Sequence, residues 1–457
     1  MASLDGGAEV SEPNILLDAL LAEAGISHAG MAARINKATA TARRPTRYDH
    51  TAVARWVRDH AIPRGDVPEI ICEIIGPKVG RVLALSDIGM ARTAGDACEM
   101  ELPKVVDQAV ALWRGDLGNK VFPVGASLIE GSAAIAPVFE WENPPYEIDV
   151  SQRGPRPVSM DDVQVLKDAR GRHEQMYRRV GGIPVRPRLV AFLNTGVTPL
   201  LRGSHDDEIG RRLFRAAGGL IALAGICAYD SDRQALSQRY LFHALRTAKA
   251  SSNLAFGGYV IALLANQAMA QAKYRRVIQY CETALRAARG HLSPALATDL
   301  HILQAKAYAR VGDRASCHAH MRLSEATAGQ IRQGEEPPET GYVQPGLLEC
   351  QHAEALRRLG DLTPAQEYAE EALRSASTCH LRGQAHRQAT LALILAERGE
   401  LEQAASTAES MLDCTEGMES ERLAERIESV TTALSAYDTQ PVKVFVARAR
   451  QQAGIPL

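Results

Sequence analysis

A short basic segment near the N-terminal end carries side chains whose types and spacing suit contact with DNA. Thr51, Arg55 and Arg58 recur at helical spacing along one face of a predicted helix that begins at Asp49, and His50 lies beside them. An arginine can donate two hydrogen bonds to a guanine edge, and small side chains allow a helix to approach the bases closely. This pattern predicts base contacts from His50, Thr51, Arg55 and Arg58.

The residues around this helix add positive charge. Between Arg34 and Arg64 there are eight basic residues and two acidic ones. Arg43, Arg44 and Arg47 lie in a polar loop before the helix, and we expect them to hold DNA phosphates whatever the base sequence. The alternative is an ordinary amphipathic helix with a solvated charged face, which explains most single stripes of this kind.

No residue pattern in the sequence indicates catalysis or metal binding. The eight cysteines lie 26 or more residues apart without a CxxC, which favours buried thiols in a reducing compartment. Cys317, His318 and His320 fit neither zinc-finger spacing nor two ligands one helical turn apart. The glycines between 218 and 225 follow no predicted strand, so they indicate close helix packing rather than a nucleotide loop. We expect no enzymatic activity, no metal and no cofactor.

A small helical domain must position the predicted DNA-contacting helix. Apolar residues at helical spacing predict a helix from Ile15 to Ala22, and Ser27 caps a second short helix. The helix that begins at Asp49 is the third, and it turns Val53 and Trp56 inward. A fourth element, Val67 to Ile75, is expected to pack over the others.

Beyond Arg211 the chain repeats itself five times, at spacings of 40, 40, 48 and 39 residues. The extra residues of the longest spacing fit an insertion around Gln333 to Pro345. The pattern predicts stacked helix pairs, because no single pair can bury its own apolar face. A plain helical bundle with alanine-rich seams is the alternative. The small residues of the first helices are Gly225, Ala265, Ala305, Ala353 and Ala392, and the turn positions are Asp232, Ala272, Gly312, Gly360 and Gly399.

These repeats resemble the tetratricopeptide repeat, although their period exceeds the about 34 residues of that repeat. The resemblance implies that the first helix of each pair lines a concave groove. Charged, amide and tyrosine side chains in such a groove suit a peptide or small-molecule effector. The alternative, that they are solvated or form surface ion pairs, stays open. The residues expected to face the groove are Tyr229, Tyr259, Asn266, Asp299, Lys306, Arg310, Glu354, Arg357 and Arg358.

Several segments together resemble one family of regulators. They include Tyr48-Asp-His-Thr with Val53-Ala-Arg-Trp, Arg188-Leu-Val-Ala-Phe-Leu, and Gln238-Arg-Tyr-Leu-Phe-His-Ala-Leu-Arg. The chain resembles actinobacterial helix-turn-helix regulators of the Cro/repressor-like class that carry a C-terminal tetratricopeptide-like domain, similar to negative regulators of differentiation and antibiotic production. The connection from Thr39 to Arg47 is longer than the usual 3–4-residue turn. The resemblance implies a transcriptional regulator of the repressor type.

We therefore expect a mainly α protein with three parts. Residues 1–94 form a helix-turn-helix DNA-binding domain, and residues 159–457 form an α-solenoid of tetratricopeptide-like repeats. Between them, residues 95–158 form a linker with short β-type segments at Val121–Ile129 and Ala134–Trp141.

The expected partners are a double-stranded DNA operator, a second copy of the chain and an effector. We expect no membrane contact and a cytoplasmic location. The first residues lack a signal peptide, and the apolar run Ala216–Tyr229 is shorter than the about 20 residues that span a bilayer. An alternative of another class is a repeat scaffold for protein partners that does not bind DNA sequence-specifically.

Overall fold

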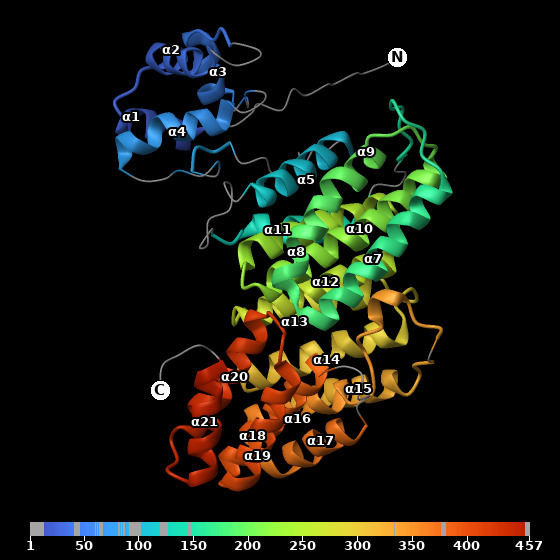
Figure 1. The fold of residues 1–457 in the computed structure, drawn as a ribbon. Helices are drawn as coiled ribbons and strands as arrows, with labels where there is room; N and C mark the ends of the chain where they lie inside the picture. The colour runs from blue at the N-terminus through green and yellow to red at the C-terminus, as the bar shows by residue number, and fades with distance from the viewer. Residues whose placement is uncertain are drawn as a thin grey trace, which may run out of the picture. The chain divides into compact units, whose positions relative to one another are not determined.

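The computed structural model describes residues 13–40, 46–59, 61, 63, 67–80, 83, 85, 87–90, 102–118, 127–144, 149–332, 334–375 and 381–452. Contacts divide the chain into an N-terminal unit, residues 1–100, and a C-terminal unit, residues 101–457. Both units are helical (Figure 1), and over the described residues extended pairing is limited to two isolated bridges, Gln152 with His205 and Pro157 with Ser204.

Four short helices build the N-terminal unit. Side chains cap three of them, at Ser27 and Asp49 as predicted and at Asn14, which was not predicted; each accepts a hydrogen bond from a first-turn backbone N–H. Such caps determine where a short helix begins, because the first four N–H groups have no partner inside the helix. The helices are α1 (Ile15–Glu23), α2 (His28–Ala38), α3 (His50–Arg58) and α4 (Val67–Val79).

The core of the N-terminal unit contains the predicted inward stripe of α3. Val53 is fully buried and Trp56 is 5% exposed, in one cluster with Met31 and Ile35 of α2. The ring of Tyr48 packs edge-on against Trp56, with the ring centres 5.0 Å apart. One face of α3 is therefore buried in the core, and the opposite face is exposed to solvent or to a partner.

The C-terminal unit begins with helices that precede the repeats. They are α5 (Leu102–Leu117), α6 (Ser132–Glu142), α7 (Met160–Val180), α8 (Gly182–Phe192), the π-helical turn η1 (Leu193–Val197) and α9 (Thr198–Leu201). Ser159 and Asp162 form a reciprocal capping box at the start of α7, where the sequence predicts a helix capped by Ser159.

Five helix pairs follow, and Figure 1 shows them succeeding one another along the unit. They are α10 (Asp207–Asp230) with α11 (Gln234–Ala250), α12 (Leu254–Ala270) with α13 (Tyr274–Ala287), α14 (Pro294–Val311) with α15 (Arg314–Ala328), α16 (Leu347–Leu359) with α17 (Leu362–Arg374), and α18 (Leu381–Arg398) with α19 (Leu401–Thr415). The short η2 (Pro338–Thr340) lies in the predicted insertion, and α20 (Glu421–Leu434) and α21 (Gln440–Gln452) end the unit.

The predicted turn positions all have a left-handed backbone. Their φ values are 51° at Asp232, 56° at Ala272, 82° at Gly312, 84° at Gly360 and 81° at Gly399. A single residue in this conformation ends a helix and reverses the chain, which is easiest for glycine. The five predicted pairs are thus present, and the arrangement is consistent with an all-α, solenoid-like protein.

The small residues of the repeat allow close helix crossing. A Cβ atom on Gly225 would lie 2.9 Å from the Cδ2 of Leu241, and one on Gly218 would lie 2.6 Å from the Cε1 of Phe256. These glycines therefore serve close packing of α10, as the sequence indicates. The repeat positions on the second helices are likewise buried, namely Ser237, Val277, Cys317, Ala365 and Ala404, followed by Ala244, Ala284, Ser324, Ala372 and Met411.

The expectation of a β-type segment at Ala134–Trp141 was wrong, because these residues belong to α6. Ala134, Val138 and Trp141 recur at helical spacing and are buried, and Tyr280 of α13 donates a hydrogen bond to the carbonyl of Ala134 at 3.0 Å. Pro137 removes one intrahelical hydrogen bond, but burial of this face holds the helix together. In the other expected segment, residues 121–126 lie outside the described residues, and 127–130 form no strand.

One described helix, α10, is long and apolar enough to cross a membrane by length and composition alone. Within the fold 83% of its apolar window is buried, as in the core helix of a soluble protein. The pair α1 and α2 passes the same test only when joined, and it bends by 88°.

Candidate functional site

The outer face of α3 carries the predicted base-contacting residues. His50, Thr51, Arg55 and Arg58 are all exposed. Arg55 has one carboxylate nearby, that of Asp59 at 3.9 Å, and the two side chains are 70% and 59% exposed. Such an exposed pair contributes little to stability, so the guanidinium group is available to another anion.

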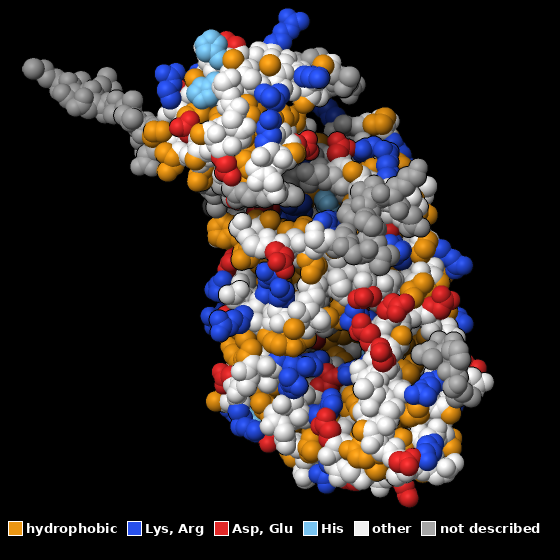
Figure 2. Space-filling model, turned by 90° about the vertical axis from the view of Figure 1, so that its left-hand side faces the viewer, with side chains coloured by type: hydrophobic (Ala, Val, Ile, Leu, Met, Phe, Trp, Pro, Cys, Tyr) orange, Lys and Arg blue, Asp and Glu red, His pale blue; other side chains and the backbone are white. Residues whose placement is uncertain are grey.

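The predicted phosphate-contacting loop is described only in part. Arg47 is exposed, whereas Arg43 and Arg44 lie outside the described residues. On the face of the N-terminal unit seen in Figure 2, Lys and Arg side chains lie among hydrophobic, histidine and a few acidic side chains.

Asp49 anchors the start of α3. Its carboxylate accepts hydrogen bonds from the Thr51 hydroxyl at 2.6 Å and from the Ala52 N–H at 3.0 Å. The hydrogen bond from Thr51 is the main reason why the pKa of Asp49 is lowered, and the Ala52 N–H adds to it. Asp49 therefore stays ionised, and the same contact orients Thr51 on the outer face.

Asn36, Thr39 and Thr46 fix α3 to α2 across the long connection, and the sequence did not predict these contacts. The Asn36 amide donates to the Tyr48 carbonyl at 2.8 Å, and its oxygen accepts from the Tyr48 N–H at 2.9 Å and the Thr46 hydroxyl at 3.1 Å. The Thr39 hydroxyl lies 2.6 Å from that of Thr46. The ends of the connection are therefore held together, so α3 keeps a defined position although the connection is long. The sequence signal for these contacts is an amide, Asn36, followed three residues later by Thr39 at the end of α2.

The second candidate site is a cavity of about 670 Å³ in the C-terminal unit, which we call the main cavity. Seven of the nine residues expected in the groove line it: Tyr229, Tyr259, Asn266, Asp299, Lys306, Arg310 and Glu354. Arg357 and Arg358 line a smaller cavity of about 120 Å³, together with Arg310 and Glu354. The structure thus brings the nine predicted residues around two adjoining spaces.

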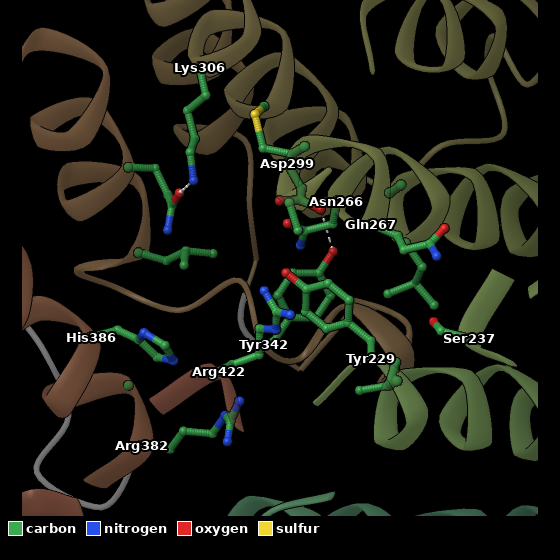
Figure 3. A pocket seen from close by; sticks show the side chains of 18 of the residues that line it. Tyr229, Ser237, Asn266, Gln267, Asp299, Lys306, Tyr342, Arg382, His386 and Arg422 are labelled. Atoms are coloured by element: carbon green, nitrogen blue, oxygen red, sulfur yellow. Dashed lines mark hydrogen bonds between the residues drawn. The ribbon is translucent and has the colours of Figure 1, made fainter. Parts of the chain in front are cut away.

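Residues that the repeat pattern did not indicate complete the walls of the main cavity. They are Arg170, Glu174 and Tyr177 of α7, Glu339 and Tyr342 of the insertion, Arg382 and His386 of α18, and Arg422 and Arg426 of α20. Figure 3 shows Tyr229 of α10, Asn266 of α12, Lys306 of α14, and Arg382 and His386 of α18 around this space. Eight arginine and lysine residues line it against five carboxylates, so its charge is positive overall.

The insertion between α15 and α16 closes one wall. Glu339, with a side chain 8% exposed, accepts a hydrogen bond from Arg215 at 2.7 Å. Burial raises the pKa of Glu339, but Arg215 and Arg170 outweigh burial and hold that pKa below its ordinary value. Tyr342 donates to the Asp299 carboxylate at 2.5 Å, and burial raises the pKa of Asp299 to about 6. The proline-rich insertion is therefore part of the cavity wall.

A buried aspartate joins the first helices of the unit to the last. Asp230, at the end of α10, is fully buried and accepts hydrogen bonds from the Gly182 N–H and the Ser420 hydroxyl, both at 2.7 Å. It also forms an ion pair with Arg382 of α18. These partners lie 48, 190 and 152 residues away in sequence. The contacts close the stack around the cavity.

Burial in the cavity changes the protonation of two groups. Lys306 lies 2.8 Å from Glu354, which also pairs with Arg426. Burial, together with the positive charges of Arg426 and Arg310, lowers the pKa of Lys306 to about 8. Burial also lowers the pKa of His386 to about 3, so this imidazole is neutral near pH 7.

The histidines considered for metal binding have other neighbours. The Nδ1 atom of His320 lies 3.2 Å from that of His301, and the ring of Tyr308 stacks on His320 with the centres 5.3 Å apart. Within the described ranges, no group of three or more His, Cys, Asp or Glu side chains could hold a metal ion.

Comparison with known protein families gives one match, to the N-terminal part of the chain. Residues 17–91 match the family model of the SP15 N-terminal domain. A search of curated proteins found no match. The matched segment covers α1 to α4, so the N-terminal unit is similar to the SP15 N-terminal domain.

Proposed function

We propose that this protein is a sequence-specific DNA-binding transcriptional regulator of the repressor type. In this proposal α2 and α3 act as a helix-turn-helix, and α3 lies in the major groove. The C-terminal unit binds a peptide or small-molecule effector and joins two chains, so that effector binding changes the affinity for DNA.

One observation carries the DNA-binding half: α3 buries Val53 and Trp56 on one face and exposes His50, Thr51, Arg55 and Arg58 as a set on the other. An α-helix is about 10–12 Å across, which matches the about 12 Å width of the major groove. The residues near the start of α3 are small, and the arginines follow. This order suits close approach of the helix start and bidentate contact further along.

The proposal that the C-terminal unit binds an effector is based on the main cavity. Its volume of about 670 Å³ falls within the about 300–1,000 Å³ typical of ligand pockets. Tyrosines, an exposed amide at Asn266 and charges of both signs line it.

The homodimer follows from the DNA-binding half. Helix-turn-helix proteins commonly bind as dimers on two half-sites about one helical turn apart. Light scattering of the full chain, free and on DNA, tests this part, and a monomer in both states contradicts it.

The DNA-binding half is tested by fluorescence anisotropy with labelled genomic fragments and random-sequence competitor. Arg55→Ala and Arg58→Ala should each weaken the preferred fragment by about 1–3 kcal/mol and relax the preference at one base position. Lys78→Ala on α4 is the matched control, because it removes an exposed positive charge away from α3 and should change little.

Two outcomes would contradict the proposal. Folded variants that bind with unchanged affinity and specificity remove Arg55 and Arg58 from the interface. A wild-type protein that shows no sequence preference and no loss of affinity with salt favours the scaffold alternative, because contacts with phosphates release counterions.

A further inference from the structure

Among the described residues, all the side chains that line the small cavity are charged. They are four arginines and two glutamates: Arg310, Arg357, Arg358, Arg426, Glu354 and Glu397. Arg310, Glu354 and Arg426 also line the main cavity, so the two spaces adjoin. The small cavity is therefore a charged end chamber of the larger one, and its volume of about 120 Å³ suits a single charged group.

The two glutamates of this chamber already have cationic partners. Glu397 accepts two hydrogen bonds from Arg357, at 2.6 and 3.0 Å. Glu354 pairs with both Lys306 and Arg426. Across the part of the chain that the structure describes, Arg310 and Arg358 have no carboxylate within ion-pair distance. The chamber therefore holds an excess of positive charge.

The pKa values of Lys306 and Arg426 reflect the repulsion between neighbouring cations. Arg310 lowers the pKa of Lys306 beyond the effect of burial and of Arg426, and it lowers the pKa of Arg426 beyond the effect of burial. Lys306 and Arg426 are therefore less favourable in their charged forms because Arg310 is near. A bound anion would relieve this repulsion.

We infer that the main cavity binds a small organic anion whose phosphate or carboxylate group is held between Arg310 and Arg358 in the end chamber. This deepens the effector half of the proposed function and rests on it. The planar guanidinium group donates paired hydrogen bonds that match the oxygen spacing of both kinds of anion. The exposed Arg310 lies at the junction of the two cavities, where it can reach a ligand that extends into both.

The main cavity suits the uncharged body of such a ligand. Arg422 stacks on Tyr229, with its Cζ atom 4.8 Å from the ring centre. Ile226 and Met269 add apolar surface, and Asn266 offers an amide that has no hydrogen-bond partner among the described residues. An aromatic or apolar body with a polar substituent fits this lining.

The test is calorimetric titration of the full chain without DNA, with three probes of similar size: phenyl phosphate, benzoate and neutral benzamide. Wild-type protein should bind at least one of the two anions and should not bind benzamide. The double variant Arg310→Gln/Arg358→Gln should lose about tenfold or more in affinity, the value of a charge-assisted hydrogen bond. The control Arg212→Gln removes an exposed arginine on α10 that pairs with Glu208 and should bind as wild type does.

Stability measurements separate a binding role from a structural one. Because Arg310 and Arg358 have no carboxylate partner, their removal leaves no unpaired buried charge. The double variant should therefore melt at the wild-type temperature or above it, and a lower melting temperature would indicate a structural role and overturn the inference. Equal affinity for benzamide and the anions, or unchanged affinity in the double variant, would overturn it as well.

The same probes distinguish anion binding in the cavity from regulation of DNA binding. Tighter binding of phenyl phosphate indicates a natural ligand with a phosphate group, and tighter binding of benzoate indicates one with a carboxylate. Anion binding that leaves DNA affinity unchanged supports the cavity assignment and contradicts the effector role. DNA binding without anion binding contradicts the cavity assignment alone.

Discussion

The two units use arginine in different surroundings. Arg55 on α3 has a side chain 70% exposed, and the carboxylate of Asp59 lies 3.9 Å away. Arg382 on α18 is 17% exposed, pairs with the fully buried Asp230 and donates to the Ser420 hydroxyl at 3.0 Å. An exposed arginine can bind an external anion. A buried arginine must keep its carboxylate partner, because an unpaired buried charge destabilises the fold.

This difference separates two kinds of site. On α3 the recognition groups stand on the surface, so a ligand as large as DNA can reach them and salt can screen them. In the cavity charges such as Lys306 and Glu354 are partly enclosed, whereas Arg310 and Arg358 are exposed at its end chamber, so a ligand must be small enough to enter. Figure 2 shows charges of both signs interspersed on the C-terminal unit.

The largest effect is expected from Asp230→Ala. The variant leaves Arg382 buried without its carboxylate, and the Gly182 N–H and Ser420 hydroxyl lose an acceptor. Loss of one partner of a buried ion pair costs about 3–5 kcal/mol in the free energy of unfolding. Urea denaturation followed by circular dichroism measures it.

The neighbouring Asp232→Asn is the matched control, because it removes the charge and asparagine tolerates the left-handed backbone at this turn. Asp232 has a 55% exposed side chain and pairs with Arg422 at 2.6 Å. We expect a loss below about 1 kcal/mol, because Asp232 is exposed and Arg422 keeps a second carboxylate partner, Glu425 at 2.8 Å. Equal losses at Asp230 and Asp232 would contradict the distinction between buried and exposed pairs.

The second prediction concerns the connection between α2 and α3. Asn36→Ala removes the hydrogen bonds to Tyr48 and Thr46 and should destabilise the N-terminal unit by about 1–3 kcal/mol. Hydrogen exchange should become faster in α3 and stay unchanged in α10 to α19. Lys37→Ala, an exposed neighbour on α2, is the control and should leave exchange as in the wild type. Unchanged exchange in the Asn36 variant would show that the connection is held by other contacts.

Acid should destabilise the C-terminal unit before it affects the start of α3. Burial lowers the pKa of His243 and His386 to about 3 and of His301 and His352 to about 4. The folded state therefore binds fewer protons than the unfolded state between about pH 3 and 6.5. Their contribution to stability is complete above about pH 6.5 and falls as the pH drops.

Two comparisons check the acid prediction. Replacing His352, which lies 2.9 Å from the Ser324 hydroxyl, with glutamine should make the fall of stability with pH less steep. At α3, the lowered pKa of Asp49 means that its contribution is present above pH 3.8 and is lost as the pH falls through its folded-state pKa. A flat pH dependence of unfolding between pH 6.5 and 4.5 would contradict burial of neutral histidines.

The smallest effect is expected in the salt dependence of DNA binding. Arg47→Gln should weaken all DNA sequences alike and reduce the slope of log K against log salt by about 1. Anion binding in the cavity should depend less on salt, because a single anionic group is neutralised there, whereas DNA presents several phosphates with condensed counterions. Equal salt dependence at the two sites would remove the contrast between them.

The sequence alone determined the local elements of this protein. Ser27, Asp49 and Ser159 begin helices where capping chemistry predicts them, and the five turn positions are left-handed. Helix starts and turns follow from interactions within a few residues, which a period of 3.6 and a single turn residue encode. The nine groove residues were expected from the resemblance to the tetratricopeptide repeat, and they line the two cavities.

Only the tertiary structure decided which distant residues meet. Asp230 finds partners up to 190 residues away, and Glu339 and Tyr342 of the insertion enter the cavity wall. The Asn36 contacts and the helical state of Ala134–Trp141 also depend on neighbours that are not adjacent in sequence. No local period specifies such contacts, because they result from the burial of whole helices against one another and from the requirement that each buried polar group find a partner.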